Sequence, residues 1–257
     1  ERYDKDNFIK NLLLDNFLLV DIYSRAKKLH IENNIRRIVY LIETNIDKDM
    51  NIVEIVRSIF PAKTKDFVTA VDEHSIILVK ELREKETMDE IEKIAKMISD
   101  TLSTELNIKV YISIGTVVSD LKDVSRSYKE AKMALEVGKI FESEKYIVNY
   151  EKLGIGRLIY QLPLSLCKMF IKEVLHGLTM DDFDEETLAT VNKFFENNLN
   201  VSETSRQLYI HRNTLVYRLD KLQKMTGLDL RNFDDAIIFK ITLMVSRYML
   251  FMEKMSY

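Results

Sequence analysis

The apolar positions along the chain change period several times, and each change marks the boundary of an expected element. Residues 6–30 carry apolar side chains at helical spacing, which predicts one or two amphipathic helices. Short runs rich in β-branched or aromatic residues predict strands at 35–43, 66–71, 75–80, 109–114 and 146–149. One-sided apolar faces predict helices between these strands, at 52–60, 88–106 and 124–140. The order β-α-β-β-α-β-α-β predicts an α+β or α/β layer, with helices packed on a mostly antiparallel sheet.

From residue 151 onward the period is helical, and no convincing strand follows. The pattern predicts helices at 153–161, 164–175, 186–198, 202–208, 212–224 and 234–252. The acidic stretch Thr179–Thr187 lacks periodicity, so it is the best candidate for a linker. Ser202 belongs to a residue type that caps helices, and we expect it to cap the helix that begins there. We therefore divide the chain into an N-terminal helical segment, 1–30, a layered domain, 31–150, a helical connector, 151–185, and an all-α domain, 186–257.

The two short helices of the all-α domain are joined by Tyr209, Ile210 and His211. Two short helices joined by a three-residue turn predict a helix-turn-helix. The second helix carries Leu215, Leu219 and Leu222 at i, i+4 and i+7, which predicts a narrow stripe that faces inward. Tyr209 stands where many helix-turn-helix sequences have glycine, so the turn is expected to require a positive φ there.

The first turn of the second helix carries side chains suited to reading bases. With the leucine stripe facing inward, Asn213 faces outward, and Arg212 and Thr214 lie beside it. A recognition helix reaches the major groove of DNA with its first turn. An Arg side chain can grip guanine and an Asn side chain can grip adenine, each through two hydrogen bonds. We therefore expect double-stranded DNA as the partner of this helix.

Other polar side chains nearby are suited to the phosphate backbone. Arg206, Tyr217 and Lys221 can each donate to phosphate oxygens. Arg218 lies nearer the leucine stripe, where it either ties the helix to a neighbour or bends out to a phosphate. A single His at a helix start, as at His211, is more often a cap or a surface residue than a ligand. The predicted DNA-contacting residues are Arg206, His211, Arg212, Asn213, Thr214, Tyr217, Arg218 and Lys221.

The charge of the predicted helix-turn-helix supports nucleic-acid binding, whereas the charge of the whole chain does not. The 257-residue chain has a formal net charge of −3, so no whole-chain attraction to DNA is expected. Between Glu203 and Lys224, five Lys and Arg residues oppose Glu203 and Asp220, which leaves about +3 on this segment. An ordinary solvated helix pair with a mildly basic face is the alternative interpretation.

The stretch "HRNTLVYRLDKLQKMTGLDL", which begins at His211, has the sequence pattern of a known protein family. This stretch resembles the C-terminal helix-turn-helix of the carbohydrate diacid regulator (CdaR) and purine catabolism regulator (PucR) family of bacterial transcription factors. The match runs from about 187 to 249. The resemblance implies a transcriptional regulator that binds operator DNA and controls a catabolic operon such as one for sugar-diacid use. A pure oligomerisation module, whose helix pair binds protein, is an alternative.

The stretch "AVDEHSIIL", Ala70–Leu78, resembles a degenerate GGDEF signature of diguanylate cyclases, and the likeness covers roughly 31–150. Ala70 and Val71 stand where the signature has glycines that let the backbone approach a nucleotide. The expected first strand offers Glu43 as its single carboxylate for a metal. We therefore expect a degenerate, noncatalytic GGDEF-like domain with Asp72 and Glu73 at a hairpin tip, followed by an all-α helix-turn-helix domain, in an α+β fold. A cyclic-dinucleotide-binding, nucleotide-binding or cyclase-like protein is the rival interpretation.

The sequence carries no sign of a disulfide, a metal site, a catalytic site or a membrane helix. Cys167 is the single cysteine and lies in an apolar helical pattern, which favours core packing in a reducing compartment, and we expect a cytoplasmic protein. The four histidines lack metal-type spacing, so no metal, cofactor or catalytic residue is expected. No apolar run is long enough for a membrane helix. The sequence begins with Glu1, so we expect a fragment whose effector is bound by a domain absent from this chain.

The last expected helix is apolar on most of its sides between Ala236 and Met252. Such a helix must be covered on most sides. Packing within the domain explains part of this pattern, and a homodimer contact would explain the rest. Dimers suit helix-turn-helix proteins, which read paired half-sites in DNA.

Overall fold

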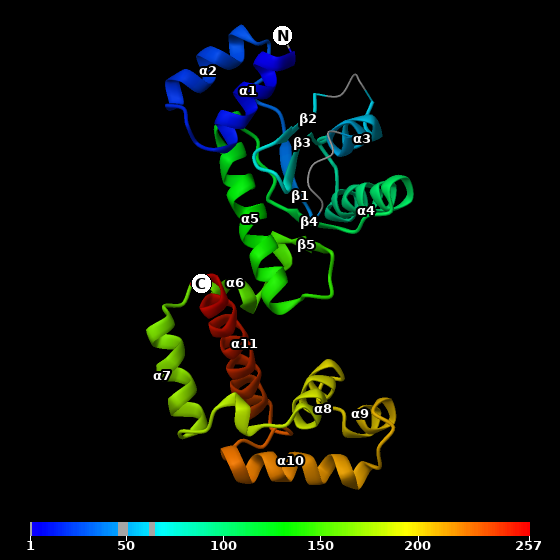
Figure 1. The fold of residues 1–257 in the computed structure, drawn as a ribbon, viewed down its shortest axis with the longest axis vertical. Coiled ribbons are helices and arrows are strands. Elements are labelled where there is room, and N and C mark those ends of the chain that lie inside the picture. Colours follow the sequence, from blue (N-terminus) through cyan, green and yellow to red (C-terminus); the bar gives the residue numbers. More distant parts are fainter. Residues whose placement is uncertain (1, 46–50, 62–64) are drawn as a thin grey trace. The chain divides into compact units, whose positions relative to one another are not determined.

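The computed structural model of the protein describes residues 2–45, 51–61 and 65–257. This part of the chain forms two compact units, Glu1–Arg157 and Leu158–Tyr257 (Figure 1). The first unit combines strands and helices, and the second is helical wherever it has regular structure. The expected α+β fold class, with a layered domain followed by an all-α domain, is confirmed.

A five-stranded sheet lies at the centre of the described part of the first unit. Its strands are β1 (Arg37–Thr44), β2 (Phe67–Ala70), β3 (Ser75–Glu81), β4 (Val110–Ile114) and β5 (Ile147–Asn149). They lie in the order β2-β3-β1-β4-β5, and every pairing is antiparallel except the parallel pair of β4 with β5. The central strand β1 is buried almost throughout because helices cover both faces of the sheet.

The two faces of the sheet divide the apolar residues of β1 by alternation. Val39 and Leu41 face a core cluster that includes residues of α1 (Arg2–Leu13), α2 (Leu19–Lys28) and α5 (Val124–Phe141). Ile38, Tyr40 and Ile42 face a second cluster with α3 (Asn51–Ile59) and α4 (Met88–Leu106). Short 3-10 helices at Leu121–Asp123 and Tyr150–Lys152 precede α5 and follow β5, and α6 (Ile155–Tyr160) spans the division between the units.

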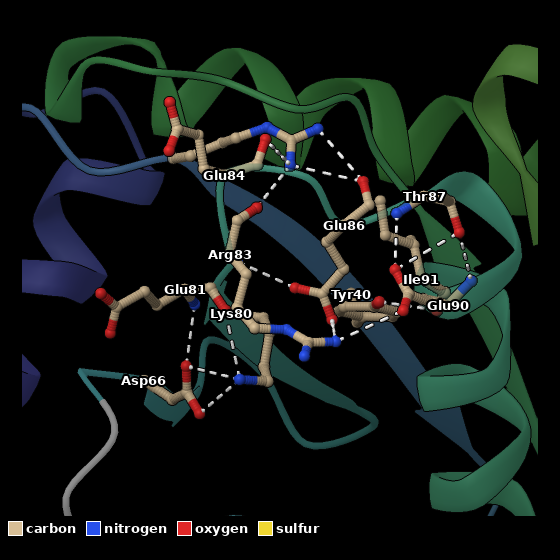
Figure 2. Close-up of polar contacts among 11 residues, drawn as sticks. Tyr40, Asp66, Lys80, Glu81, Arg83, Glu84, Glu86, Thr87, Glu90 and Ile91 are labelled. Atoms are coloured by element: carbon tan, nitrogen blue, oxygen red, sulfur yellow. Dashed lines mark hydrogen bonds and ion pairs between the residues drawn. The ribbon is translucent and has the colours of Figure 1, made fainter.

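Polar contacts hold both the end of β3 and the start of α4, on either side of the connection between them (Figure 2). The hydroxyl of Tyr40 donates to the carbonyl oxygen of Ile91 at 2.7 Å, and burial raises the pKa of this tyrosine. The carboxylate of Asp66 accepts the backbone N–H of Glu81 at 2.8 Å and lies 3.0 Å from the Lys80 ammonium. Both side chains of this ion pair are largely buried, so removal of either one would leave an uncompensated charge in the protein.

Several helices of the second unit contribute to a shared apolar core cluster. Its elements are α7 (Leu164–Leu175), a 3-10 helix at Met180–Asp182, α8 (Glu185–Glu196), α9 (Val201–Gln207), α10 (Arg212–Thr226) and α11 (Phe233–Met255). The core residues are Leu175, Phe183, Val191, Phe194, Leu215, Leu219, Leu222, Leu230, Phe239 and Leu243. Cys167 is buried as expected, and burial raises the pKa of its thiol.

Two sequence-based predictions in this unit are wrong. The segment Thr179–Thr187 is folded rather than an open linker, because its acidic residues cap helices and its aromatic residue enters the core. Phe183 is 6% exposed and meets the Phe239 ring edge-on at 5.8 Å, while Asp184 caps α8. Ser202 does not cap α9, because the helix begins one residue earlier and the side chain of Asn200 accepts the Glu203 N–H at 2.9 Å.

Gly115, which directly follows β4, provides a test of the packing between the end of this strand and α5. A Cβ atom at Gly115 would lie 2.1 Å from the backbone oxygen of Ser127, whereas one at Gly154 would meet nothing within 4 Å. We expect Gly115→Ala to lower the free energy of unfolding by about 3 kcal/mol, because backbone must move. Gly154→Ala, at φ +59°, should cost only about 1 kcal/mol of backbone strain. Urea unfolding followed by circular dichroism compares the two variants, and equal losses would contradict this account.

Candidate nucleic-acid interface

The corner between α9 and α10 is closed by two backbone hydrogen bonds. The N–H of Tyr209 donates to the backbone carbonyl oxygen of Arg206 at 3.2 Å, and the N–H of Ile210 donates to that of Ser205 at 3.1 Å. This pair of bonds is a Schellman motif, which ends a helix with one residue in the left-handed region. Tyr209 is that residue, with φ 54°, as the sequence led us to expect. Ile210 packs against the core of the second unit and so anchors the corner.

The leucine stripe fixes which side of α10 faces solvent. Leu215, Leu219 and Leu222 are at most 1% exposed. The imidazole Nδ1 of His211 accepts the N–H of Asn213 at 3.3 Å, so His211 caps the start of the helix. At the other end, Gly227 adopts φ 78°, and its N–H donates to the backbone carbonyl oxygen of Gln223 at 2.8 Å. The helix is therefore held along its length and at both ends.

The opposite side of α10 is polar and open. Arg212, Asn213, Thr214, Tyr217 and Lys221 are all exposed, and we call them the α10 polar face. The structure thus leaves five of the predicted residues exposed on the same helix. Tyr217 is 67% exposed although it is aromatic, so its ring is available to a partner. The Arg212 guanidinium donates to the Ser202 hydroxyl at 3.0 Å, which links the start of α10 to α9.

Arg206 lies on α9 and is already paired within the protein. Its guanidinium donates to the carboxylate of Glu203, with an Nε–Oε2 distance of 3.0 Å, and Gln207 donates to the same carboxylate at 2.7 Å. Hydrogen bonds from Arg206 and then Gln207 hold the pKa of Glu203 below its usual range. The Arg206 pKa is raised, chiefly by its hydrogen bond to Glu203. Because the pair is exposed, its net free energy is small, and Arg206 can exchange Glu203 for another anion.

Arg218 takes the structural role that the sequence left open. Its guanidinium donates to the Thr190 hydroxyl at 2.9 Å and pairs with Glu186, and both partners lie on α8. The Arg218 side chain is 19% exposed. Arg218 therefore ties α10 to α8 and lies outside the α10 polar face.

A second arginine that the sequence did not single out fixes the far end of α10. Arg231 contacts Asp220 and Asp229, each at 2.7 Å, and donates to Gln223 at 3.2 Å. The hydrogen bond from Arg231 lowers the pKa of Asp229. These contacts join the loop after α10 back to the helix. No sequence spacing reveals them, because they depend on how this loop folds over the helix.

The degenerate GGDEF hairpin carries its acidic residues at an exposed tip. The carboxylate of Asp72 accepts the N–H of His74 at 2.8 Å, and Glu73 is exposed beside it. On β1, Glu43 pairs with Lys139 of α5. Within residues 2–45, 51–61 and 65–257, no group of three or more His, Cys, Asp or Glu side chains is placed to hold a metal ion. Among the helices of the same ranges, none is long and apolar enough to cross a membrane.

The tie between α10 and α8 can be tested by its contribution to stability. We expect Arg218→Met to lower the free energy of unfolding by about 1–2 kcal/mol, because it removes hydrogen bonds of a charged group. Lys221→Met is the matched control, since Lys221 is exposed on the same helix, and its effect should stay within about 0.5 kcal/mol. Equal stabilities of the two variants in urea unfolding would show that Arg218 contributes nothing to the packing of α10.

Comparison with protein families matches both parts of the chain. The model of the PucR C-terminal helix-turn-helix domain matches residues 187–245, which include α9, the corner and α10. The model of the GGDEF-like domain matches residues 17–137, which include β1 to β4. The two resemblances predicted from the sequence are thereby confirmed.

Known regulators show the same likeness. The chain is 29% identical to the purine catabolism regulatory protein of Bacillus subtilis (strain 168), over 57% of this chain and 28% of that protein. It is 32% identical to the carbohydrate diacid regulator of Escherichia coli (strain K12), over 53% of this chain and 35% of that regulator. It is 25% identical to the proline-responsive transcriptional activator PutR of Bacillus subtilis (strain 168), over 76% of this chain and 49% of that activator. The chain thus spans less than half the length of these relatives. The chain therefore combines a region that matches the GGDEF-like domain model with a following region that matches the PucR C-terminal helix-turn-helix domain model, and it is similar to the purine catabolism and carbohydrate diacid regulators.

Proposed function

We propose that the chain is part of a bacterial transcriptional regulator that binds operator DNA by inserting α10 into the major groove. The observation that carries this proposal is the exposure of Arg212, Asn213 and Thr214 on a helix whose other side is fixed by buried leucines. A recognition helix needs both properties, because its first turn must reach base edges without a change of fold. The names of the relatives, which are regulators of purine catabolism and of carbohydrate diacid use, support this function.

In this proposal the predicted contact residues divide into four groups. Arg212 and Asn213 read bases, because their side chains can form paired hydrogen bonds with guanine and adenine. Tyr217 and Lys221 contact phosphates, and Arg206 joins them by exchanging Glu203 for a phosphate oxygen. His211 caps the start of the helix, and Thr214 lies beside Asn213 in the first turn. Arg218 acts indirectly, since it holds α10 against α8.

We propose a homodimer as the DNA-binding species, with a catabolic operon as its target. Ile237, Leu250 and Met255 of α11 are 37%, 56% and 67% exposed, so packing within the unit leaves apolar surface on this helix. A dimer places two recognition helices at half-sites about 34 Å apart, one turn of DNA. The effector would bind a part of the protein outside this chain and change the relative placement of these helices. Such control requires that the effector bind one of the two states more tightly. The cytoplasm, where the operon lies, is the proposed location.

DNA titrations test the proposal. Fragments from upstream of this gene and its neighbours are titrated with the protein at 50 and 200 mM salt. We expect affinity for one fragment to fall by about a thousandfold, because a dimer contacting about six phosphates releases their counterions. Equally weak, sequence-independent binding to every fragment would contradict the proposal.

A double variant tests base readout. We expect Arg212→Ala with Asn213→Ala to lose at least about tenfold in affinity for the preferred fragment, since each lost base contact contributes about 1–3 kcal/mol of discrimination. Lys168→Ala with Lys172→Ala, on the exposed surface of α7, is the control and should retain wild-type affinity. If both double variants bind alike, Arg212 and Asn213 do not read bases.

We propose that the GGDEF-like domain is noncatalytic. The side chains of Ala70 and Val71 occupy positions where a cyclase would need bare backbone, and Glu43 is engaged by Lys139. Incubation with GTP and Mg²⁺, followed by chromatography of the products, should yield no cyclic di-GMP. Formation of cyclic di-GMP would show an active cyclase and favour the rival interpretation of this chain as a nucleotide enzyme.

A further inference from the structure

Tyr209 adopts a backbone conformation that is unfavourable for its residue type. Seven non-glycine residues in the described ranges have a positive φ. Asp, Asn and His are the non-glycine residue types that most often adopt this region, and they account for Asp15, His30, Asn107, His176 and Asn198. Leu199 packs against the core of the second unit, so burial offsets its strain. Tyr209 is 96% exposed, and no such compensation applies to it.

The strain at Tyr209 follows from the closure of the corner. The two hydrogen bonds of the Schellman motif require a left-handed residue at this position, and glycine adopts that conformation without a steric cost. A tyrosine there lowers stability, and its exposed ring returns almost no packing within the protein. Strain that persists at an exposed side chain suggests that the side chain has a role outside the folded chain itself.

The position of Tyr209 in the corner indicates what it contacts. It stands three residues before Arg212, between the helix that crosses the DNA backbone and the helix that enters the groove in a helix-turn-helix complex. A residue at this corner lies next to the phosphates that flank the site. A tyrosine offers a hydroxyl that donates to a phosphate oxygen and a flat ring that covers a sugar.

We propose that Tyr209 contacts the DNA backbone, with its hydroxyl donating to a phosphate oxygen beside the bases that α10 contacts. The inference rests on the DNA-binding function proposed above and assigns a contact residue beyond those predicted from the sequence. It predicts an unusual combination, in which a substitution raises the stability of the protein and weakens DNA binding at the same time.

Substitutions at Tyr209 separate these effects. We expect Tyr209→Gly to raise Tm by roughly 5 °C, because it removes the backbone strain. The same variant should lose about tenfold in affinity for the preferred DNA fragment, because a hydrogen bond to a charged group is lost. Tyr209→Phe keeps the ring and the strain but lacks the hydroxyl, so its Tm should match the wild type while its affinity falls by a similar factor. Tyr3→Phe, at an exposed tyrosine of the first unit, is the matched control and should change neither quantity.

The outcomes distinguish this inference from the function on which it rests. If the wild-type chain shows no sequence-preferring, salt-dependent binding, the proposed DNA-binding function fails. If the wild type binds and both Tyr209 variants bind equally well, DNA binding stands and the contact by Tyr209 is overturned. If Tyr209→Gly lowers Tm and affinity together, the ring has a structural role and the proposal is wrong. If sedimentation without DNA shows that the variants lose a dimer, Tyr209 contacts protein rather than phosphate.

Discussion

The burial of Leu215, Leu219 and Leu222 is the constraint on which the candidate interface depends. These side chains join the core formed with α8 and α11, and their burial fixes the rotation of α10 about its own axis. Once that rotation is fixed, the 3.6-residue period of the helix places Asn213, Tyr217 and Lys221 on the solvent side. The polar contacts fix the position of the helix and add a smaller stabilisation. Arg218 joins α10 to α8, and Arg231 joins the following loop to the end of α10.

Where local signals agree with the apolar period, the sequence predicts the fold closely. The helix predicted at 88–106 has these bounds in the structure, because Thr87 and Glu90 form a capping box at its start and Asn107 adopts φ 54° at its end. Strand ends are predicted less well, by one or two residues, because hydrogen-bond partners rather than side-chain pattern decide them. The segment Thr179–Thr187 was misjudged for a related reason, since helix caps and a single buried Phe183 leave no periodic trace.

The candidate site was predictable to a similar degree. The inward stripe and the outward face of α10 follow from spacing alone, and so does the positive φ at Tyr209 once the three-residue turn is recognised. The pairing of Arg206 with Glu203 also lies within one helical turn. In contrast, the contacts of Arg218 and Arg231 span separate elements. A single sequence carries no direct signal for such contacts, because they depend on the tertiary arrangement of the helices.

The contact between Arg218 and the first turns of α8 has a mechanical consequence. Glu186 and Thr190 lie in the first two turns of α8, so the guanidinium of Arg218 adds a polar link between this part of the chain and α10 to the apolar core that they share. A displacement of the chain ahead of α8 would therefore reach α10 through this polar link as well as through the apolar core. The helix that meets DNA in the proposed function is thus coupled to the incoming polypeptide by a polar link, which can be broken and remade at lower cost than a packed interface.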